Sequence, residues 1–133
     1  MTIYTKDKSK IIDVGSPSFL YCFYSTICLR IPKSVNISTG ITFLQSGYVS
    51  GDNCIACAHD FEQVRKIFMA LPPDKVVWNM EHQEQQPPWG KNISPHIRSI
   101  GNYFVTATGE DLLEEVIQLL HYAGEHNLDV RIG

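Results

Sequence analysis

The sequence predicts a single α+β domain in which a small, mostly antiparallel sheet packs with about three helices. Residues 108–125 carry apolar side chains at three- and four-residue steps, which is the pattern of an amphipathic helix. Residues 75–80 and 102–106 are rich in valine and aromatic side chains, which favour strands. Because no strand–helix–strand unit repeats, the order favours an α+β fold over a parallel sheet. At 133 residues the chain is long enough for one core and too short for two.

The first ten residues are polar and rich in lysine, so we expect them to form a flexible N-terminus. The folded domain would then cover residues 11–133 and begin with a short strand over residues 11–14. Charged side chains interrupt the apolar core that a secretory signal peptide needs. The sequence contains no run of about 18 apolar residues, so no membrane-spanning helix is predicted. The sequence therefore predicts a cytoplasmic protein without a membrane partner.

The first predicted helix follows Ser16. The serine oxygen can accept hydrogen bonds from the free N–H groups of the first turn, and Pro17 is tolerated at the first helical position. Residues 19–31 are apolar on nearly every side, so periodicity alone fits either a buried helix or a strand. The capping residue and the length of the run favour a helix, which Pro32 ends.

The middle of the chain alternates between loop and helix patterns. Residues 33–53 contain three glycines among serines and threonines, which predicts a loop with one short element near residues 41–45. The polar turn at residues 51–53 can cap a second helix that runs to about residue 71. Its apolar stripe, which should face the core, consists of Ile55, Ala58, Phe61, Val64, Ile67, Phe68 and Leu71. Two prolines then end this helix.

The last helix is predicted by the clearest pattern in the chain. Its apolar face lies opposite an acidic one, and acidic side chains in the first two turns suit the positive end of the helix dipole. Thr108 and Asp111 have the spacing of a capping box. The apolar face consists of Leu112, Leu113, Val116, Ile117, Leu119, Leu120 and Ala123. Gly124 should weaken the end of the helix, and residues 128–132 are expected to add a closing strand.

Charge and motifs argue against several classes of function. The formal net charge is −3, and no basic run could hold the phosphates of a nucleic acid, so direct nucleic-acid binding is not expected. The five histidines show no H-E-x-x-H or other metal-binding spacing. The chain also has neither a phosphate-binding glycine loop nor a G-x-S-x-G nucleophile motif. We therefore expect no catalytic residue, no metal and no cofactor.

One cysteine pair could carry chemistry, namely Cys54 and Cys57, with His59 nearby. A C-x-x-C pair at a helix N-terminus can have a lowered thiol pKa, as in thioredoxin-like sites. The alternative function is therefore a thiol-dependent enzyme or redox protein. Because no βαβ unit accompanies the pair, we favour two incidental thiols. In a reducing cytosol, free thiols are the expected state of the cysteines.

A stiff loop lies between the two strands predicted at residues 75–80 and 102–106. Pro87 and Pro88 each fix a φ angle and lack an N–H donor, so the backbone before Trp89 is ordered at little entropic cost. The indole of Trp89 could plug the open end of the sheet, which we favour, or form an exposed hot spot for a partner. Either role indicates a shaped surface rather than a catalytic site.

Two polar groups are candidates for contact with a partner protein. The wholly polar run 81–86 should form an exposed loop, and recognition residues commonly lie in such loops. Its candidate residues are Glu81, His82 and Glu84. The acidic group of the last helix is either a solvated helix face, the simpler interpretation, or a surface for a basic partner. It consists of Glu110, Asp111, Glu114 and Glu115.

Several short motifs occur in an order that is specific as a set. They are LPPDKVVWN at residues 71–79, PPWGKNIS at residues 87–94, NYFVT at residues 102–106 and GEDLL at residues 109–113. This set resembles the immunity protein 70 family of bacterial polymorphic-toxin systems. The resemblance covers most of the chain beyond Ile11 and is weakest over residues 32–58.

The resemblance implies a non-catalytic cytoplasmic protein whose partner is the C-terminal domain of one cognate toxin. Such toxins are delivered in contact-dependent growth inhibition or related systems, and a nuclease is one possible activity. The immunity protein would bind and neutralise the toxin by covering its active site or its substrate-docking surface. The candidate toxin-binding residues are then Glu81, His82, Glu84, Trp89, Glu110, Asp111, Glu114 and Glu115.

Overall fold

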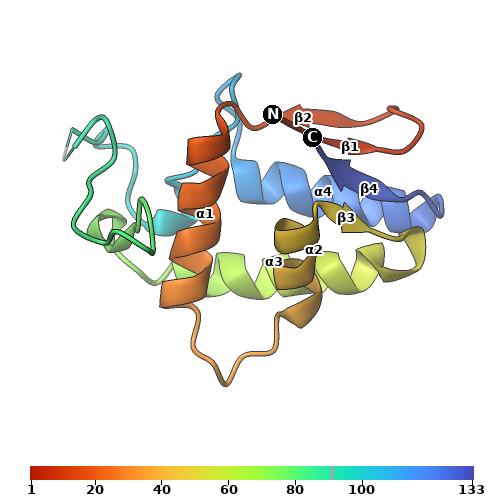
Figure 1. Ribbon diagram of the computed structural model, residues 1–133, viewed down its shortest axis with the longest axis horizontal. Helices are drawn as coiled ribbons and strands as arrows, with labels where there is room; N and C mark the ends of the chain where they lie inside the picture. The colour runs from red at the N-terminus through yellow and green to blue at the C-terminus, as the bar shows by residue number, and fades with distance from the viewer. Residues whose placement is uncertain (91) are drawn as a thin grey trace.

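The computed structural model describes residues 1–90 and 92–133. Within these residues the chain forms four α-helices and one four-stranded antiparallel sheet, which confirms the predicted α+β class (Figure 1). The helices are α1 (Pro17–Arg30), α2 (Ser38–Ser46), α3 (Cys54–Phe68) and α4 (Leu112–Glu125). The strands are β1 (Thr2–Thr5), β2 (Ile11–Asp13), β3 (Tyr48–Val49) and β4 (Val130–Ile132). None of the helices in the described residues has the length and apolarity that crossing a membrane requires.

The N-terminus is an interior part of the sheet, which corrects the expectation of a flexible segment over residues 1–10. The strand order is β2-β1-β4-β3, so β1 has a neighbour on each side. Ile3 is 1% exposed and pairs with Ile12 on one side and Ile132 on the other. The lysines that suggested a frayed end all lie in the turn between β1 and β2, outside the strands. The buried alternation of Ile3 and Thr5 is the strand signal that they obscured.

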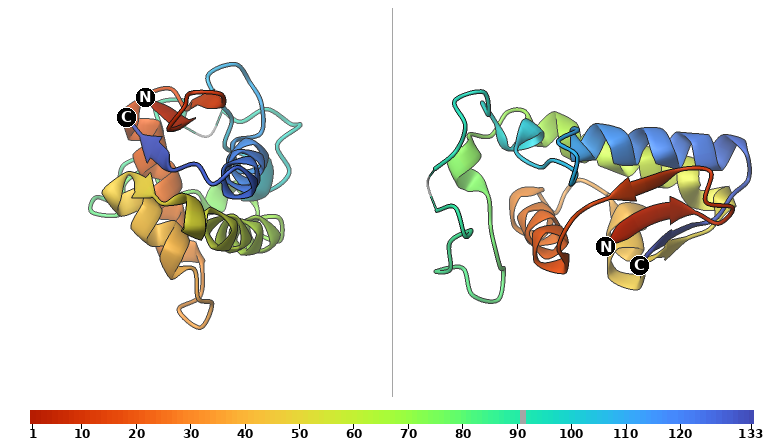
Figure 2. Two further views of the ribbon diagram at one scale, coloured as in Figure 1. Left: turned by 90° about the vertical axis from the view of Figure 1, so that its right-hand side faces the viewer. Right: turned by 90° about the horizontal axis from the view of Figure 1, so that it is seen from above.

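The two ends of the chain lie side by side in the sheet (Figures 1 and 2). The N–H of Thr2 donates to the carbonyl of Gly133 at 3.0 Å, and the N–H of Gly133 donates to the carbonyl of Thr2 at 2.9 Å. The strands predicted near residues 11–14 and 128–132 are confirmed as β2 and β4. The sheet therefore joins segments from both ends of the chain.

The helices follow the sequence pattern closely. The Ser16 hydroxyl caps α1 by accepting from the N–H of Phe19 at 3.2 Å, as predicted. At the start of α4, the Asp111 carboxylate accepts from the N–H of Glu114 at 3.1 Å. Thr108 takes no part in that cap, so the proposed capping-box pair is wrong. The short element expected near residues 41–45 is the full helix α2.

The core lies between the long helices α3 and α4 and the elements that cover them. In Figure 1, α1 and α2 run steeply across α3, and the sheet lies beside α4. Rings from separate elements meet in this core, as Phe23 of α1 does with Phe61 of α3 at a centroid distance of 6.2 Å. Gly124 does more than weaken the end of α4. A Cβ there would lie 2.6 Å from the Ile55 side chain, so glycine permits the close approach of α3 and α4.

The strands predicted at residues 75–80 and 102–106 are not formed. Residues 69–111 instead make one long α3–α4 connection with two 3₁₀ turns, at Pro73–Lys75 and Ile100–Asn102, and Lys91 lies outside the described residues. The buried hydroxyl of Thr26 in α1 accepts from the N–H of Val77 at 2.9 Å, and its one proton lies within reach of the carbonyls of Cys22, at 2.8 Å, and Val77, at 3.2 Å. A helix side chain thus satisfies the Val77 N–H, which a neighbouring strand would otherwise have paired.

Candidate functional site

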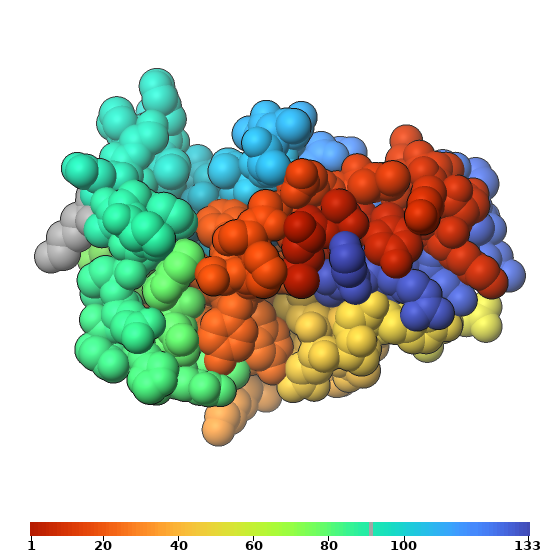
Figure 3. All heavy atoms as spheres, turned by 45° about the horizontal axis from the view of Figure 1, so that its top comes forward, coloured from red at the N-terminus to blue at the C-terminus, as the bar shows by residue number. Residues whose placement is uncertain are grey.

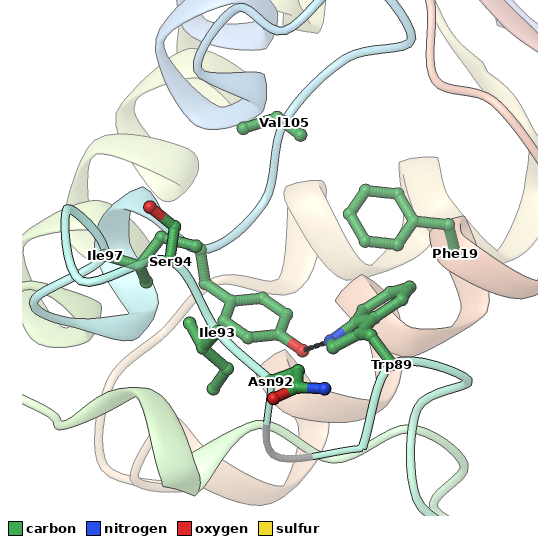
Figure 4. Close-up of a pocket in the computed structure, with 8 residues that line it drawn as sticks. Phe19, Trp89, Asn92, Ile93, Ser94, Ile97 and Val105 are labelled. Atoms are coloured by element: carbon green, nitrogen blue, oxygen red, sulfur yellow. Dashed lines mark hydrogen bonds between the residues drawn. The ribbon is translucent and has the colours of Figure 1, made fainter.

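Trp89 lies on the α3–α4 connection and is anchored by three other rings. The centroids of Phe19, Trp78 and Tyr103 lie 6.0, 5.7 and 6.2 Å from that of Trp89. Its indole N–H donates to the Tyr103 hydroxyl at 2.6 Å (Figure 4). The Trp89 side chain is 38% exposed, and its loop lies at the end of the molecule away from the sheet. The expectation that it plugs the open end of the sheet is therefore wrong.

The rings of Phe19, Trp89 and Tyr103 also line an apolar pocket of about 270 Å³. Figure 4 shows Phe19 and Trp89 on one side, with Ile93, Ile97 and Val105 also lining the pocket. Burial raises the pKa of the Tyr103 hydroxyl to about 12, so this group stays protonated at neutral pH. The described lining residues include no carboxylate, histidine or cysteine. The pocket is suited to holding an apolar group and has no acid–base pair for catalysis.

The loop candidates Glu81, His82 and Glu84 are exposed, as the polar run predicted. His82 Nδ1 lies 3.7 Å from the Glu84 carboxylate, which is an exposed and weak contact. Glu81 lies beside Tyr21 of α1. Burial, and next the charge of Glu81, raise the pKa of the Tyr21 hydroxyl above its ordinary value. Glu81 therefore forms part of the surface along α1, whereas Glu84 is paired within its own loop.

The acidic candidates at the start of α4 already have partners in the fold. The Glu110 carboxylate accepts hydrogen bonds from the hydroxyls of Thr106 and Thr108, and these bonds hold its pKa below the ordinary value. Asp111 caps the helix. The Glu114 carboxylate lies 3.8 Å from the Arg65 guanidinium and accepts from the side-chain amide of Gln118. These contacts account for the three carboxylates structurally, without any partner protein.

Glu115 lies apart from these contacts. It lines a hollow of about 210 Å³ between β2 and α4, together with Lys10 and Tyr122. The ammonium group of Lys10 lies over the ring of Tyr122 at 5.1 Å from its centroid. Glu115 thus lines the same hollow as a basic side chain, which makes this part of the surface less negative.

The structure does not gather the eight candidates into one cluster. Glu81, His82, Glu84 and Trp89 lie on the connection, and the other four lie at the start of α4. The apolar pocket lies between the two groups, because it is lined by Trp89 and by Val105, which pairs with Asp111 in an isolated β-bridge. The connection and the loop before α4 both appear on the face shown in Figure 3.

A further hollow lies along α1, and the sequence interpretation did not predict it. We call it the tyrosine groove, about 420 Å³ in volume, and define it by Leu20, Tyr21, Tyr24, Leu44, Met80 and Glu81. The rings of Tyr21 and Tyr24 lie 6.2 Å apart, and the side-chain amide of Gln45 donates to the Tyr24 hydroxyl at 2.8 Å. The signal that could have revealed it is the apolar character of α1 on nearly every side. A helix with one buried face has apolar residues to spare on the other.

The family model for immunity protein 70 matches residues 3–132, from β1 to β4. The chain belongs to this family. It is therefore an immunity protein against a toxin, and family membership suggests a non-enzymatic role. A search of curated proteins and a search of solved structures returned no match.

Two motifs that carried the resemblance to the immunity protein 70 family meet in space. Trp89 comes from the PPWG motif and Tyr103 from the NYFVT motif, and a hydrogen bond joins their side chains. Both residues line the apolar pocket. These motifs therefore hold the long connection against α1, where Phe19 packs on Trp89 and Phe104.

The thiols of this immunity protein are poorly suited to chemistry. Cys54 and Cys57 begin α3, as the redox alternative requires, but both are 0% exposed. Burial, followed by the charge of Asp129, raises the pKa of Cys54 to about 11, and burial also raises the pKa of Cys57 strongly. A reactive thiol needs a lowered pKa and access to its substrate. Within the described residues, no group of three histidine, cysteine or acidic side chains could hold a metal.

We expect replacement of the buried cysteines to change stability and leave protection intact. Cys57→Ser places a hydroxyl in a fully buried position, which should lower the free energy of unfolding by about 1–3 kcal/mol. Cys57→Ala, which buries no polar group, is the matched control and should be milder. Chemical denaturation measures both variants. A folded Cys54→Ala, Cys57→Ala protein that binds its toxin normally but no longer protects cells would support thiol chemistry instead.

Glu110→Gln tests whether Glu110 stabilises the fold through its charge. Because the pKa of Glu110 is lowered in the folded state, its charge stabilises the protein above the ordinary pKa of 4.5, and this contribution disappears as the pH falls through the lowered value. Glu110→Gln should therefore lower the melting temperature at pH 7. The difference from the parent protein should vanish in strong acid. A difference that is independent of pH would show that the carboxylate charge has no such role.

Proposed function

We propose that this immunity protein protects a cell by stoichiometric binding to one cognate toxin domain in the cytosol. The toxin in this proposal is the C-terminal domain of a polymorphic toxin delivered by cell contact, and its activity is that of a nuclease. The observation that carries the proposal is the family match over residues 3–132. The apolar, non-titrating character of the pocket beside Trp89 supports binding over catalysis.

The proposed contact surface combines the connection with the start of α4. Tryptophan and tyrosine anchors within a polar rim are typical of protein interfaces. Tyr21 provides such a side chain beside Glu81, and Trp89 provides one at the apolar pocket. A nuclease that binds a polyanion has a basic site, so carboxylates at positions 81, 84, 114 and 115 would complement it. His82, Glu110 and Asp111 complete the surface at its two ends.

Co-expression tests this function directly. The toxin domain encoded in the neighbouring reading frame is expressed with and without this chain, and growth, co-purification and molar ratio are measured. We expect protection only when the immunity protein is present at least in equal molar amount. Rescue by substoichiometric protein together with turnover of a small substrate would overturn the binding proposal.

Charge reversal at the start of α4 tests the acidic part of the surface. Glu114→Lys with Glu115→Lys should slow association with the toxin domain and make the remaining affinity less sensitive to salt. The free energy of unfolding should fall by roughly 1–2 kcal/mol, because the reversal removes the Glu114–Arg65 contact and places two lysines at the positive end of the helix dipole. Stopped-flow mixing over a range of salt concentrations measures the association rate. Glu125→Lys on the last turn of the same helix provides the matched control, and equal rates for both variants would remove this helix end from the surface.

A further inference from the structure

Helix α1 has an apolar face that the protein itself leaves partly uncovered. Its inner face carries Cys22, Phe23 and Ile27, all at most 1% exposed. Its outer face carries Leu20, Tyr21 and Tyr24, which are only partly buried although no charged residue separates them. Arg30 is the one charged residue in α1. A helix that is apolar on both faces normally has a partner on each.

The tyrosine groove lies on this outer face. Figure 3 shows α1 in orange between the green connection on one side and the N-terminal residues and α2 on the other. An adjoining hollow of about 360 Å³ shares Pro17 and Tyr21 with the tyrosine groove and extends it to Trp78. The floor is held in place from the connection, because the N–H of Met80 donates to the buried hydroxyl of Ser25 at 3.1 Å. The groove is therefore a preformed feature of the fold.

The lining of the groove contains one charged side chain and the charged N-terminus. Among its lining side chains only Glu81 is charged, and residues 76–90 contain no lysine or arginine. The ammonium group of Met1, which also lines the groove, donates to the carbonyl of Gly15 at 2.9 Å. Arg30 lies at the far end of α1, where its guanidinium Nε donates to the carbonyl of Lys75. Among the described residues no lysine or arginine forms an ion pair with Glu81, so the connection side of the groove presents this carboxylate beside an apolar floor.

We propose that the tyrosine groove is the docking site for a segment of the toxin that presents an apolar side chain next to a lysine or arginine. The apolar side chain packs on Tyr21, Tyr24 and Met80, and the cation meets Glu81. Tyrosine offers a large contact area at little entropic cost, which makes these two rings suitable anchors. This inference rests on the proposed function, because the occupant is the toxin.

Binding measurements on paired variants test the groove. The probe is the toxin domain encoded in the neighbouring reading frame. Tyr21→Ala and Glu81→Lys should each weaken the affinity for this domain by about tenfold or more. Leu29→Ala, an exposed apolar position on the same helix, and Glu125→Lys, the same charge change on α4, should each leave affinity within about twofold. Melting temperatures confirm that each variant is folded. Because Glu81 is exposed, Glu81→Lys should stay folded. This variant therefore still tests the groove if Tyr21→Ala unfolds.

Crosslinking identifies the occupant independently of affinity. Benzoylphenylalanine in place of Tyr21 should form a photo-adduct with the toxin domain, whereas the same group in place of Tyr48 on β3 should not. Adducts between two copies of this chain, or full affinity in both groove variants, would overturn the inference. If the parent protein fails to bind the toxin at all, the proposed function itself is wrong, so the two failures are distinguishable.

Discussion

Replacing Phe104 by alanine should lower the free energy of unfolding by about 3–5 kcal/mol. The Phe104 side chain is 1% exposed and lies where the connection meets α1 and α3. Its ring centroid lies 5.1 to 6.3 Å from those of Phe23, Tyr103, Phe19 and Phe68. Alanine would leave a cavity among rings that belong to separate elements, so the surrounding structure could close only in part. Urea denaturation of the purified variant measures the loss.

Phe104→Leu provides the control for Phe104→Ala. It keeps most of the side-chain volume, so we expect a loss of roughly 1.5 kcal/mol or less. A domain of this size has only about 5–15 kcal/mol of stability, and protection in cells should therefore fall with the folded fraction of the alanine variant. If Phe104→Ala unfolds at the same denaturant concentration as the parent protein, the connection does not close the core as described.

Trp89→Ala should lower the free energy of unfolding by about 2–3 kcal/mol, less than the 3–5 kcal/mol typical of a fully buried ring. The smaller value follows because the Trp89 side chain is 38% exposed. The substitution removes one side of the apolar pocket and leaves the Tyr103 hydroxyl without its indole donor. Denaturant unfolding measures the loss, and binding to the neighbouring toxin domain is measured on the folded protein.

Trp89→Phe separates the ring from its hydrogen bond. It keeps an aromatic wall beside Phe19 and lacks the N–H, so we expect a loss of about 1 kcal/mol. Affinity for the toxin domain then decides the role of the indole. A folded Trp89→Ala protein with full affinity would make Trp89 a structural residue and remove it from the proposed surface. A fully stable variant would show that the three surrounding rings do not depend on it.

The acidic residues at the start of α4 show which properties of a candidate site depend on tertiary contacts. The sequence places four acidic residues at the start of a helix. A solvated helix face and a partner-binding surface both have this pattern, so the pattern does not distinguish them. The structure separates the four by their surroundings: Glu110 bonds two threonines, Asp111 is a cap, Glu114 lies near Arg65, and Glu115 lines a hollow with Lys10. Arg65 and Lys10 are far away in the sequence, so these contacts depend on the packing of α3 and β2 against α4.

Local pattern was sufficient for the elements that form through local interactions. A helix closes its hydrogen bonds within a few residues, so the serine cap, the apolar stripes and the prolines predicted α1, α3 and α4, although α3 ends at Phe68 and α4 begins only at Leu112. The family motifs were also legible in the sequence, and with them the immunity function. The valine and aromatic runs at residues 75–80 and 102–106 have strand propensity, but propensity does not provide a neighbouring strand.

Only the tertiary structure decided which segments pair and which surfaces stay open. β1 forms because β4, from the other end of the chain, lies beside it, and no local signal could outweigh the lysines that follow Thr5. Val77 is instead held by the Thr26 hydroxyl, 51 residues away in sequence. The pocket beside Trp89 and the tyrosine groove likewise arise where the long connection meets α1. The physical reason is the same in each case, since backbone pairing and side-chain burial between distant segments depend on how the whole chain packs.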